Sequence, residues 1–322
     1  MIKKTAYTHV SGTDGLNLFV VRTEPEDAGE IRGSAVILHG MCEHKGRYDA
    51  FTGYLAEHGF VTVIFDLRGH GESVRSEKDF GYFYEGGYDA LVSDAHEILA
   101  ETKAYAGERT GRKNLPCVMI AHSMGTLCAR CYIRNFDDEI DKLCLLGCPS
   151  ERGGMLPGLL IAKTIALVKG QKGHSRIVDH LVNDAFEKRF KKEILPFSWI
   201  NSDPVEVQEY LADPLCGFRF TLNGYINLIR MTMETYRDGG YSMKHANLPI
   251  RFFSGADDPC AVSKKKLGDA MRLLRKQGYT DTKGKMYPGL RHEILREKEK
   301  ETVYADILKF LTGEGGTECD NT

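Results

Sequence analysis

The chain of 322 residues carries 43 lysines and arginines against 45 aspartates and glutamates, a formal net charge of −2 at pH 7. This length suits one large α/β domain with an insertion as well as it suits two domains. A near-neutral balance gives no global basic field, so we expect no nucleic-acid partner. The basic runs at 188–192 and 264–266 are interpreted as solvated helix faces.

The first seven residues lack the apolar region and cleavage site of a secretory signal, and no apolar stretch reaches transmembrane length. We therefore expect a cytoplasmic protein. Nine scattered cysteines, an odd number, fit buried thiols better than a disulfide framework. Cys128 and Cys131 have CxxC spacing, but no second such pair accompanies them, so we expect no zinc site there.

Short apolar runs alternate with helix-period segments through the first half, a pattern typical of βαβ units and a parallel sheet. We expect an edge strand at 16–22, strands at 34–38, 61–65, 117–121, 142–146, 249–253 and 284–287, and helices at 47–58, 89–106, 263–277 and 299–312. The tail at 313–322 is predicted to be flexible.

The alternation stops between residues 151 and 247, where the composition favours helices interrupted by three prolines. We interpret this segment as a helical cap inserted between a first core part at 1–150 and a second at 248–312. Its apolar opening, 155–168, is either a helix packed on the core or a lid that lines a substrate pocket or touches a lipid surface. On the lid interpretation, Leu156, Leu159 and Leu160 contact substrate.

A serine follows the compact apolar run at 117–120 and precedes a helix-period stretch. The turn Ala121-His122-Ser123-Met124-Gly125 has small residues at both ends, as in the sharp turn that exposes a nucleophilic serine above a parallel sheet. Ala121 departs mildly from the usual glycine. By itself the pentapeptide also fits an ordinary turn or N-cap. If Ser123 is a nucleophile, an acid and then a histidine should follow it along the chain.

Both partners are found in that order. His292 lies in a turn after the last predicted strand and before the last predicted helix, where a general base should stand, whereas His39, His70 and His122 precede the serine. For the acid, two adjacent carboxylates follow the strand at 249–253. The spacing from Gly255 favours Asp258, and Asp257 is the alternative.

Backbone amides are predicted to bind the oxyanion. One is the N–H of Met124, at the start of a helix, and the other is that of Met41, where Gly40 permits close approach. Gly40 and His122 are therefore also expected to line the substrate site. Glu43, His44 and Arg47 follow in this loop and either contact substrate or hydrogen-bond to the loop itself.

A second glycine-containing loop, Asp66-Leu67-Arg68-Gly69-His70-Gly71-Glu72-Ser73, is interpreted as structural because it lacks the features of a phosphate-binding loop.

Together, residues 39–48, 66–73, the serine turn, 255–258 and 289–293 resemble the α/β-hydrolase superfamily, and within it the monoacylglycerol lipases and bacterial lysophospholipases. The resemblance spans residues 10–312 and is weakest in the cap. It implies a cap between the sixth and seventh main strands, no cofactor, and hydrolysis of a carboxylic ester through an acyl-enzyme on Ser123.

The expected function is therefore hydrolysis of esters with medium or long acyl chains, such as monoacylglycerol or lysophospholipid. Related folds also cleave proline peptides or transfer acyl groups. Four cap glutamates could hold the substrate amine of an aminopeptidase: Glu187, Glu193, Glu206 and Glu209. A third hypothesis is a binding protein without catalytic activity, which a degraded set of site residues would favour.

Overall fold

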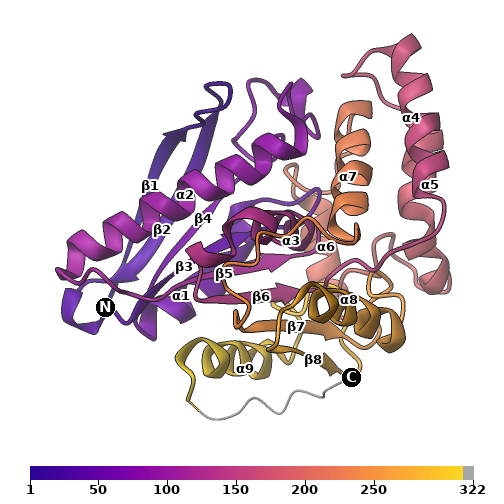
Figure 1. The fold of residues 1–322 in the computed structure, drawn as a ribbon. Helices are drawn as coiled ribbons and strands as arrows, with labels where there is room; N and C mark the ends of the chain where they lie inside the picture. The colour runs from indigo at the N-terminus through magenta and orange to yellow at the C-terminus, as the bar shows by residue number, and fades with distance from the viewer. Residues whose placement is uncertain (315–322) are drawn as a thin grey trace.

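A computed structural model describes residues 1–314, and its centre is a twisted sheet of eight strands (Figure 1). The strands are β1 (Ile2–Val10), β2 (Asn17–Pro25), β3 (Gly33–Leu38), β4 (Phe60–Phe65), β5 (Cys117–His122), β6 (Lys142–Leu146), β7 (Ile250–Gly255) and β8 (Thr282–Tyr287). Their order across the sheet is β1-β2-β4-β3-β5-β6-β7-β8. β1 and β2 pair antiparallel to their neighbours, and all other pairs are parallel. The mostly parallel α/β sheet predicted from the sequence is confirmed.

One prediction about the sheet is wrong. The strand expected at 16–22 is not an edge strand, because the N-terminal segment forms β1 and covers it from Ile2 to Val10. No residue of β1 is fully buried. Its half-buried face consists of Thr5, Tyr7 and His9, so the strand lacks the apolar alternation by which strands are usually recognised.

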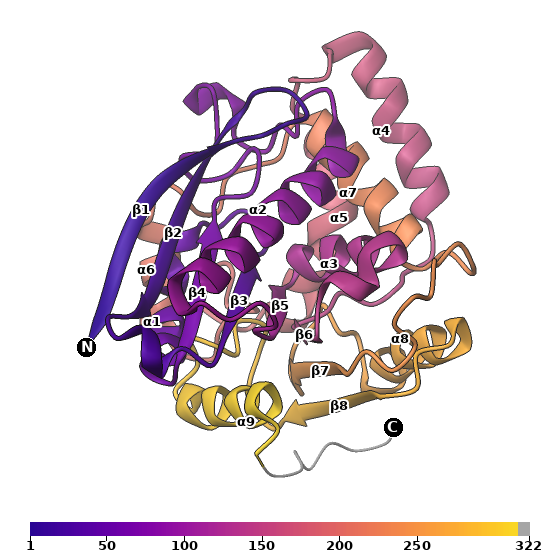
Figure 2. The same ribbon diagram turned by 60° about the vertical axis from the view of Figure 1, so that its left-hand side comes forward.

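Helices cover both faces of the sheet (Figures 1 and 2). α2 (Gly87–Thr110), α3 (Met124–Phe136) and α8 (Lys264–Gln277) share one apolar cluster, and α1 (Asp49–Glu57) and α9 (Lys300–Thr312) share the other. Successive residues of the central strands alternate between these clusters: Val36 and Leu38 belong to the first, Ala35 and Ile37 to the second. Burial on both faces explains why these strands are continuous apolar runs.

Four helices separate β6 from β7: α4 (Met155–Lys169), α5 (Arg176–Glu187), α6 (Pro204–Ala212) and α7 (Leu222–Thr235). In both ribbon views α4, α5 and α7 stand together beside the sheet (Figures 1 and 2). Asp203 caps α6, and Pro204 occupies its first turn, where a missing N–H costs nothing. We call residues 151–247 the cap below.

Within residues 1–314, no helix is both long and apolar enough to cross a membrane. All eight cysteines in this part of the chain are buried and form no disulfide bond with one another, including Cys128 and Cys131 on α3. The predicted flexible tail lies outside the described residues from 315 onwards.

Candidate functional site

Ser123 occupies a tight turn between β5 and α3. Its φ is +50°, an uncommon conformation for a residue with a side chain, and its N–H donates to Leu146 O at 2.9 Å on the neighbouring strand. The helix can start this close to β3 because residue 125 is glycine: a Cβ there would lie 2.3 Å from Leu38 O. The turn therefore directs the Ser123 hydroxyl away from the sheet, into a cavity above its edge.

His292 and Asp258 form one hydrogen-bonded chain with Ser123. His292 Nε2 lies 2.8 Å from Ser123 Oγ, and His292 Nδ1 lies 3.0 Å from Asp258 Oδ2. A carboxylate only accepts, so Nδ1 carries the imidazole proton and Nε2 is free to accept from the hydroxyl. His292 is 169 positions from Ser123 and 34 positions from Asp258 along the chain, and the three side chains meet at the edge of the sheet.

Asp258 is buried, and its other oxygen accepts from Cys260 N at 2.8 Å. Burial raises the pKa of Asp258, but the adjacent His292 imidazole and the Cys260 N–H favour the ionised form and lower it overall. Asp257, the alternative, is 48% exposed and pairs with Arg189 of the cap at 2.9 Å. The structure therefore brings Asp258, not Asp257, to the imidazole.

The two residues whose amides are predicted to bind the oxyanion lie on different elements. Met124 is the first residue of α3, where an N–H has no intrahelical acceptor, and Met41 follows Gly40 in the loop after β3. Both residues line the cavity. Gly40 is required here, because a Cβ would lie 2.5 Å from Glu43 Oε1 and 3.0 Å from Ser123 Cβ.

A buried ion pair supports this loop. Glu43 Oε1 accepts from Gly40 N at 2.5 Å and from Tyr48 OH at 2.9 Å, and it lies 3.0 Å from His122 Nδ1. The other ring nitrogen, His122 Nε2, lies 3.2 Å from the carbonyl oxygen of His292. An oxygen acceptor at each nitrogen favours the doubly protonated form of the His122 imidazole.

The pKa shifts in this cluster agree with that assignment. Burial lowers the pKa of His122, but the Glu43 carboxylate outweighs burial and raises it. Burial raises the pKa of Glu43, but His122 outweighs it and lowers the pKa well below its usual range. Arg47 forms an ion pair with Glu43 at 3.5 Å under the loop, and it donates a hydrogen bond to buried Glu293 at 2.6 Å.

His44 points elsewhere. Its Nε2 lies 2.8 Å from Asp213 Oδ2 and its Nδ1 accepts from Gly46 N. His44, Asp213 and Cys216 place their donor atoms within 4.8 Å of one another. Because Nδ1 accepts from Gly46 N, it carries no proton, and a metal on Nε2 would leave the imidazole with no proton at all. The hydrogen bonds of His44 therefore fit a capping role better than a metal site. Asp258, Cys260 and His292 form a similar group, in which His292 is already engaged.

The loop at 66–73, predicted to be structural, holds the segment that follows Met41 through the Asp66 carboxylate. Asp66 accepts from Lys45 N at 2.8 Å and from Glu72 N at 2.8 Å. The Lys45 ammonium lies 2.6 Å from the same carboxylate. These contacts fix the start of the segment that follows Met41.

The cavity above Ser123 has a volume of about 870 Å³ and lies between the sheet and the cap. Its apolar lining includes Met155, Ile161, Leu181, Phe197, Trp199 and Leu228. Gly40 and His122 line it as expected from the sequence, and so do Met41, Met124 and His292.

The three leucines expected at the substrate site do not line the cavity. Leu156 and Leu160 face outward and are exposed, and Leu159 is buried in the main apolar cluster. α4 instead presents Met155, Gly158 and Ile161, which share a helix face at intervals of three residues. The predicted leucines therefore lie outside the face of α4 that lines the cavity. The sequence of 155–168 does not show which face that is, because the segment is apolar on every side.

Two further contacts were not predicted from the sequence. The ring of Trp199 contacts that of His292. Glu43 pairs with His122, although the glutamate three residues after Gly40 and the histidine before the serine were both visible in the sequence. Nothing local in the sequence connects residues 79 positions apart.

The chain is similar over nearly its whole length to lipases and to an esterase of known structure. The chain is 24% identical over 317 residues to a monoacylglycerol lipase of Mycolicibacterium smegmatis, which covers 97% of this chain and 99% of the relative. It is 21% identical over 314 residues to the monoglyceride lipase of Homo sapiens, covering 96% and 91%. A carboxyl esterase from Bacillus coagulans, solved in complex with glycerol, superposes with a TM-score of 0.83 at 24% identity over 96% of this chain and 98% of the other.

These likenesses show the α/β-hydrolase fold, and the relatives are lipases and esterases. Residues 29–299 match the model of one family, Hydrolase_4, described as serine aminopeptidase, S33. Because that match spans most of the chain, the protein belongs to the Hydrolase_4 family of α/β-hydrolases.

Proposed function

We propose that the protein hydrolyses carboxylic esters of medium or long acyl chains through an acyl-enzyme on Ser123. The observation that carries the proposal is the hydrogen-bonded chain from Asp258 through His292 to Ser123, which opens into a large, mainly apolar cavity. A serine hydroxyl is a weak nucleophile until a base accepts its proton, and this arrangement supplies that base.

The proposed reaction follows from these contacts. Ser123 Oγ attacks the ester carbonyl carbon while its proton passes to His292 Nε2, and the carbonyl oxygen becomes an oxyanion that the amides of Met41 and Met124 bind. His292 then gives the proton to the alcohol oxygen as the carbon–oxygen bond breaks. Water, deprotonated by the same imidazole, hydrolyses the acyl-enzyme and restores Ser123.

The cavity supports an acyl ester as substrate. Its volume is in the range of sites that enclose a small-molecule ligand, and the lining is predominantly apolar, which favours burial of an acyl chain. The monoacylglycerol lipases among the relatives are consistent with a monoacylglycerol or a lysophospholipid.

The aminopeptidase alternative has less support. Of the four cap glutamates, Glu193 pairs with Arg291, and Glu206 and Glu209 both pair with Arg296. Only Glu187 lines the cavity, and it accepts from two N–H groups, one of them the Trp199 indole. Both donors bond to Oε1, so among these four glutamates a substrate amine in the cavity could reach one carboxylate, that of Glu187.

The substrate class can be tested with one assay series. We expect the protein to release p-nitrophenol from acyl esters, with kcat/KM rising as the acyl chain lengthens from acetyl to at least octanoyl, because each buried methylene contributes about 0.8 kcal/mol. Prolyl p-nitroanilide should be turned over far more slowly. A preference for the prolyl amide, or for acetate alone, would contradict the proposal.

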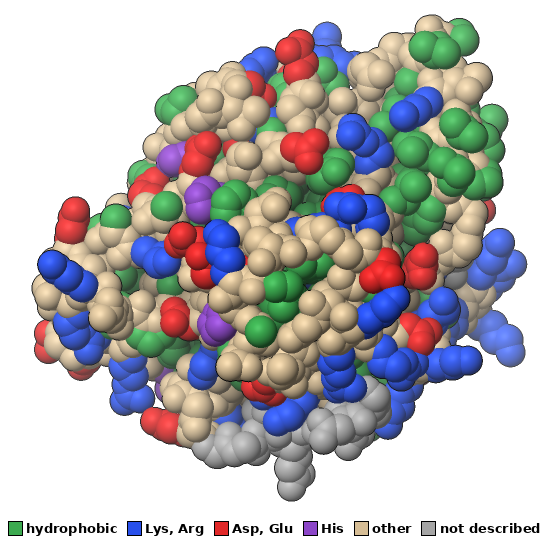
Figure 3. Space-filling model, in the orientation of Figure 1, with side chains coloured by type: hydrophobic (Ala, Val, Ile, Leu, Met, Phe, Trp, Pro, Cys, Tyr) green, Lys and Arg blue, Asp and Glu red, His purple; other side chains and the backbone are tan. Residues whose placement is uncertain are grey.

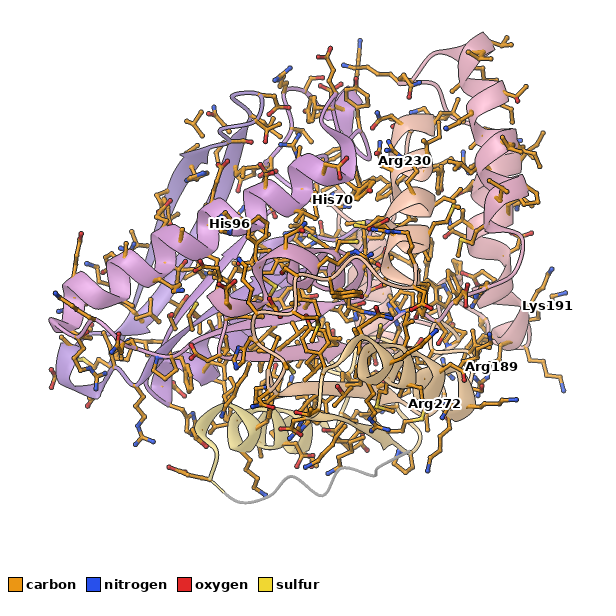
Figure 4. All side chains as sticks on the ribbon, viewed as in Figure 1. His70, His96, Arg189, Lys191, Arg230 and Arg272 are labelled. Atoms are coloured by element: carbon orange, nitrogen blue, oxygen red, sulfur yellow. The ribbon has the colours of Figure 1, made fainter. Side chains whose placement is uncertain are left out.

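We further propose that the cap contacts anionic lipid surfaces transiently. Apolar side chains are exposed along α4 and α5, and Leu167 and Val168 are 88% and 87% exposed. Residues 155–192 also carry eight lysines and arginines against three acidic residues. Figure 3 shows the apolar side chains gathered over the cap, and Figure 4 places Arg189 and Lys191 at its lower end. Exposed apolar groups beside basic ones match an anionic interface.

The double variant Leu167→Asp and Val168→Asp tests this contact. We expect this variant to lose most of its cosedimentation with phosphatidylglycerol vesicles. Two apolar side chains that would enter the lipid surface are replaced by negative charges, which the anionic lipid repels. Hydrolysis of a short soluble ester should persist, since neither side chain lines the cavity. Val10→Asp, at a 59% exposed apolar site on β1, serves as the matched control and should bind vesicles like the wild type. Equal binding by all three proteins would contradict the proposal.

A further inference from the structure

The loop that carries His292 is fastened to the cap as well as to the core. The N–H of Glu293 donates to Ile200 O at 2.7 Å. The buried carboxylate of Glu297 accepts from Ser202 N at 3.0 Å and also from the Ser202 hydroxyl. The cap segment 198–202 therefore has a fixed position relative to His292.

Trp199, the only tryptophan of the chain, lies in this segment and contacts the imidazole of His292. The ring centroids of Trp199 and His292 lie 5.2 Å apart, with the planes inclined at 46°. The indole is itself held: its N–H donates to Glu187 Oε1 at 3.1 Å, and it stacks on Phe186 at 4.9 Å. Its orientation is thus fixed by groups other than His292.

The imidazole of His292 is in this way enclosed on several sides. Asp258 holds Nδ1, and the indole lies against the ring. The ring of His122 lies 4.8 Å away, on the side of the Glu43 network. The contact with Trp199 is the one that comes from the cap.

We propose that Trp199 is a positioning residue for His292, which keeps the imidazole aligned and stabilises its charge while it carries the proton between Ser123 and the leaving alcohol. The inference rests on the proposed esterase function. During acyl transfer, Nε2 takes the proton from Ser123 Oγ and delivers it to the alcohol oxygen as the ester bond breaks, so the ring is briefly an imidazolium. An aromatic ring within about 6 Å attracts such a cation through its quadrupole.

The effect should depend on the leaving group. Both esters need His292 as the base when Ser123 attacks. The ethyl ester also needs proton transfer to its departing oxygen, whereas p-nitrophenolate leaves without it. A residue that supports His292 at that step therefore matters more for the ethyl ester. A residue that only stabilises the folded cap affects both esters alike.

The test compares kcat/KM of the wild type, Trp199→Leu and Trp199→Phe on the ethyl and p-nitrophenyl esters of one acyl chain. Leucine removes the aromatic ring, and we expect about a 5- to 30-fold loss on the ethyl ester and less than about 3-fold on the p-nitrophenyl ester. Phenylalanine keeps an aromatic face and should restore the ethyl ester to within about 3-fold of the wild type. Equal losses on both esters, or no loss on either, would overturn the proposal.

A second pair of variants covers the case in which Trp199→Leu fails to fold. Glu187→Leu removes the acceptor of the indole N–H, and we expect it to lower kcat/KM more on the ethyl ester than on the p-nitrophenyl ester, by a smaller factor than Trp199→Leu. Glu187→Gln keeps an acceptor oxygen, and its kcat/KM should not depend on the leaving group in this way. A wild type inactive on both esters would refute the proposed function. An active wild type with uniform losses in the variants would refute only the role of Trp199.

Discussion

Ser123→Ala is expected to lower kcat for ester hydrolysis by at least about 10⁴-fold, because the proposed acyl-enzyme forms on the Ser123 hydroxyl. The Ser123 hydroxyl lies 2.8 Å from His292 Nε2, so its removal leaves the cavity and the proposed oxyanion amides in place but takes away the proposed nucleophile. Rates are measured by p-nitrophenol release, with active sites counted by a fluorophosphonate probe that labels the wild type and not the variant.

A second substitution at the same position separates chemistry from folding. Ser123→Gly also removes the hydroxyl, but glycine adopts a φ of +50° without strain, so this variant should melt at or above the temperature of the wild type. An inactive Ser123→Ala that melts like the wild type would assign the loss to chemistry. If either variant kept more than about a tenth of the activity, Ser123 would not be the nucleophile, and a binding role without catalysis would regain support.

The sequence was informative where chemistry and burial restrict the residue type. The central strands are buried on both faces and appear as apolar runs, and the order of Ser123, Asp258 and His292 follows from the position of each loop at the same edge of a parallel sheet. Those positions could be predicted because the rule relating them is topological.

The sequence was less informative where several arrangements satisfy the same composition. β1 has polar and apolar residues with no buried member, so periodicity gave no signal. α4 is apolar on all sides, so its sequence left open which residues face the cavity and which face solvent. The contact between Trp199 and His292 joins segments 93 residues apart and depends on how the cap docks, which no local pattern records.

The two adjacent carboxylates between which spacing left the choice open have different surroundings in the structure. Asp258 lies in the buried turn after β7 and reaches His292, while Asp257 points outward to an exposed ion pair with Arg189. Loss of an exposed pair generally changes stability by less than about 1 kcal/mol. The two aspartates therefore form a matched pair for substitution, one residue apart.

Asp258→Asn is expected to lower kcat by about 10⁴-fold, and Asp257→Asn by less than about 3-fold. Asp258 accepts from His292 Nδ1 and from Cys260 N through different oxygens. Asparagine has only one acceptor oxygen there, so its amide N–H₂ must face one of these two donors. If it faces His292, the imidazole turns to the tautomer that cannot accept from Ser123. If it faces Cys260, a buried N–H loses its partner. Steady-state kinetics and thermal melts of both variants distinguish these outcomes, and a large loss in Asp257→Asn with a small one in Asp258→Asn would transfer the acid role to Asp257.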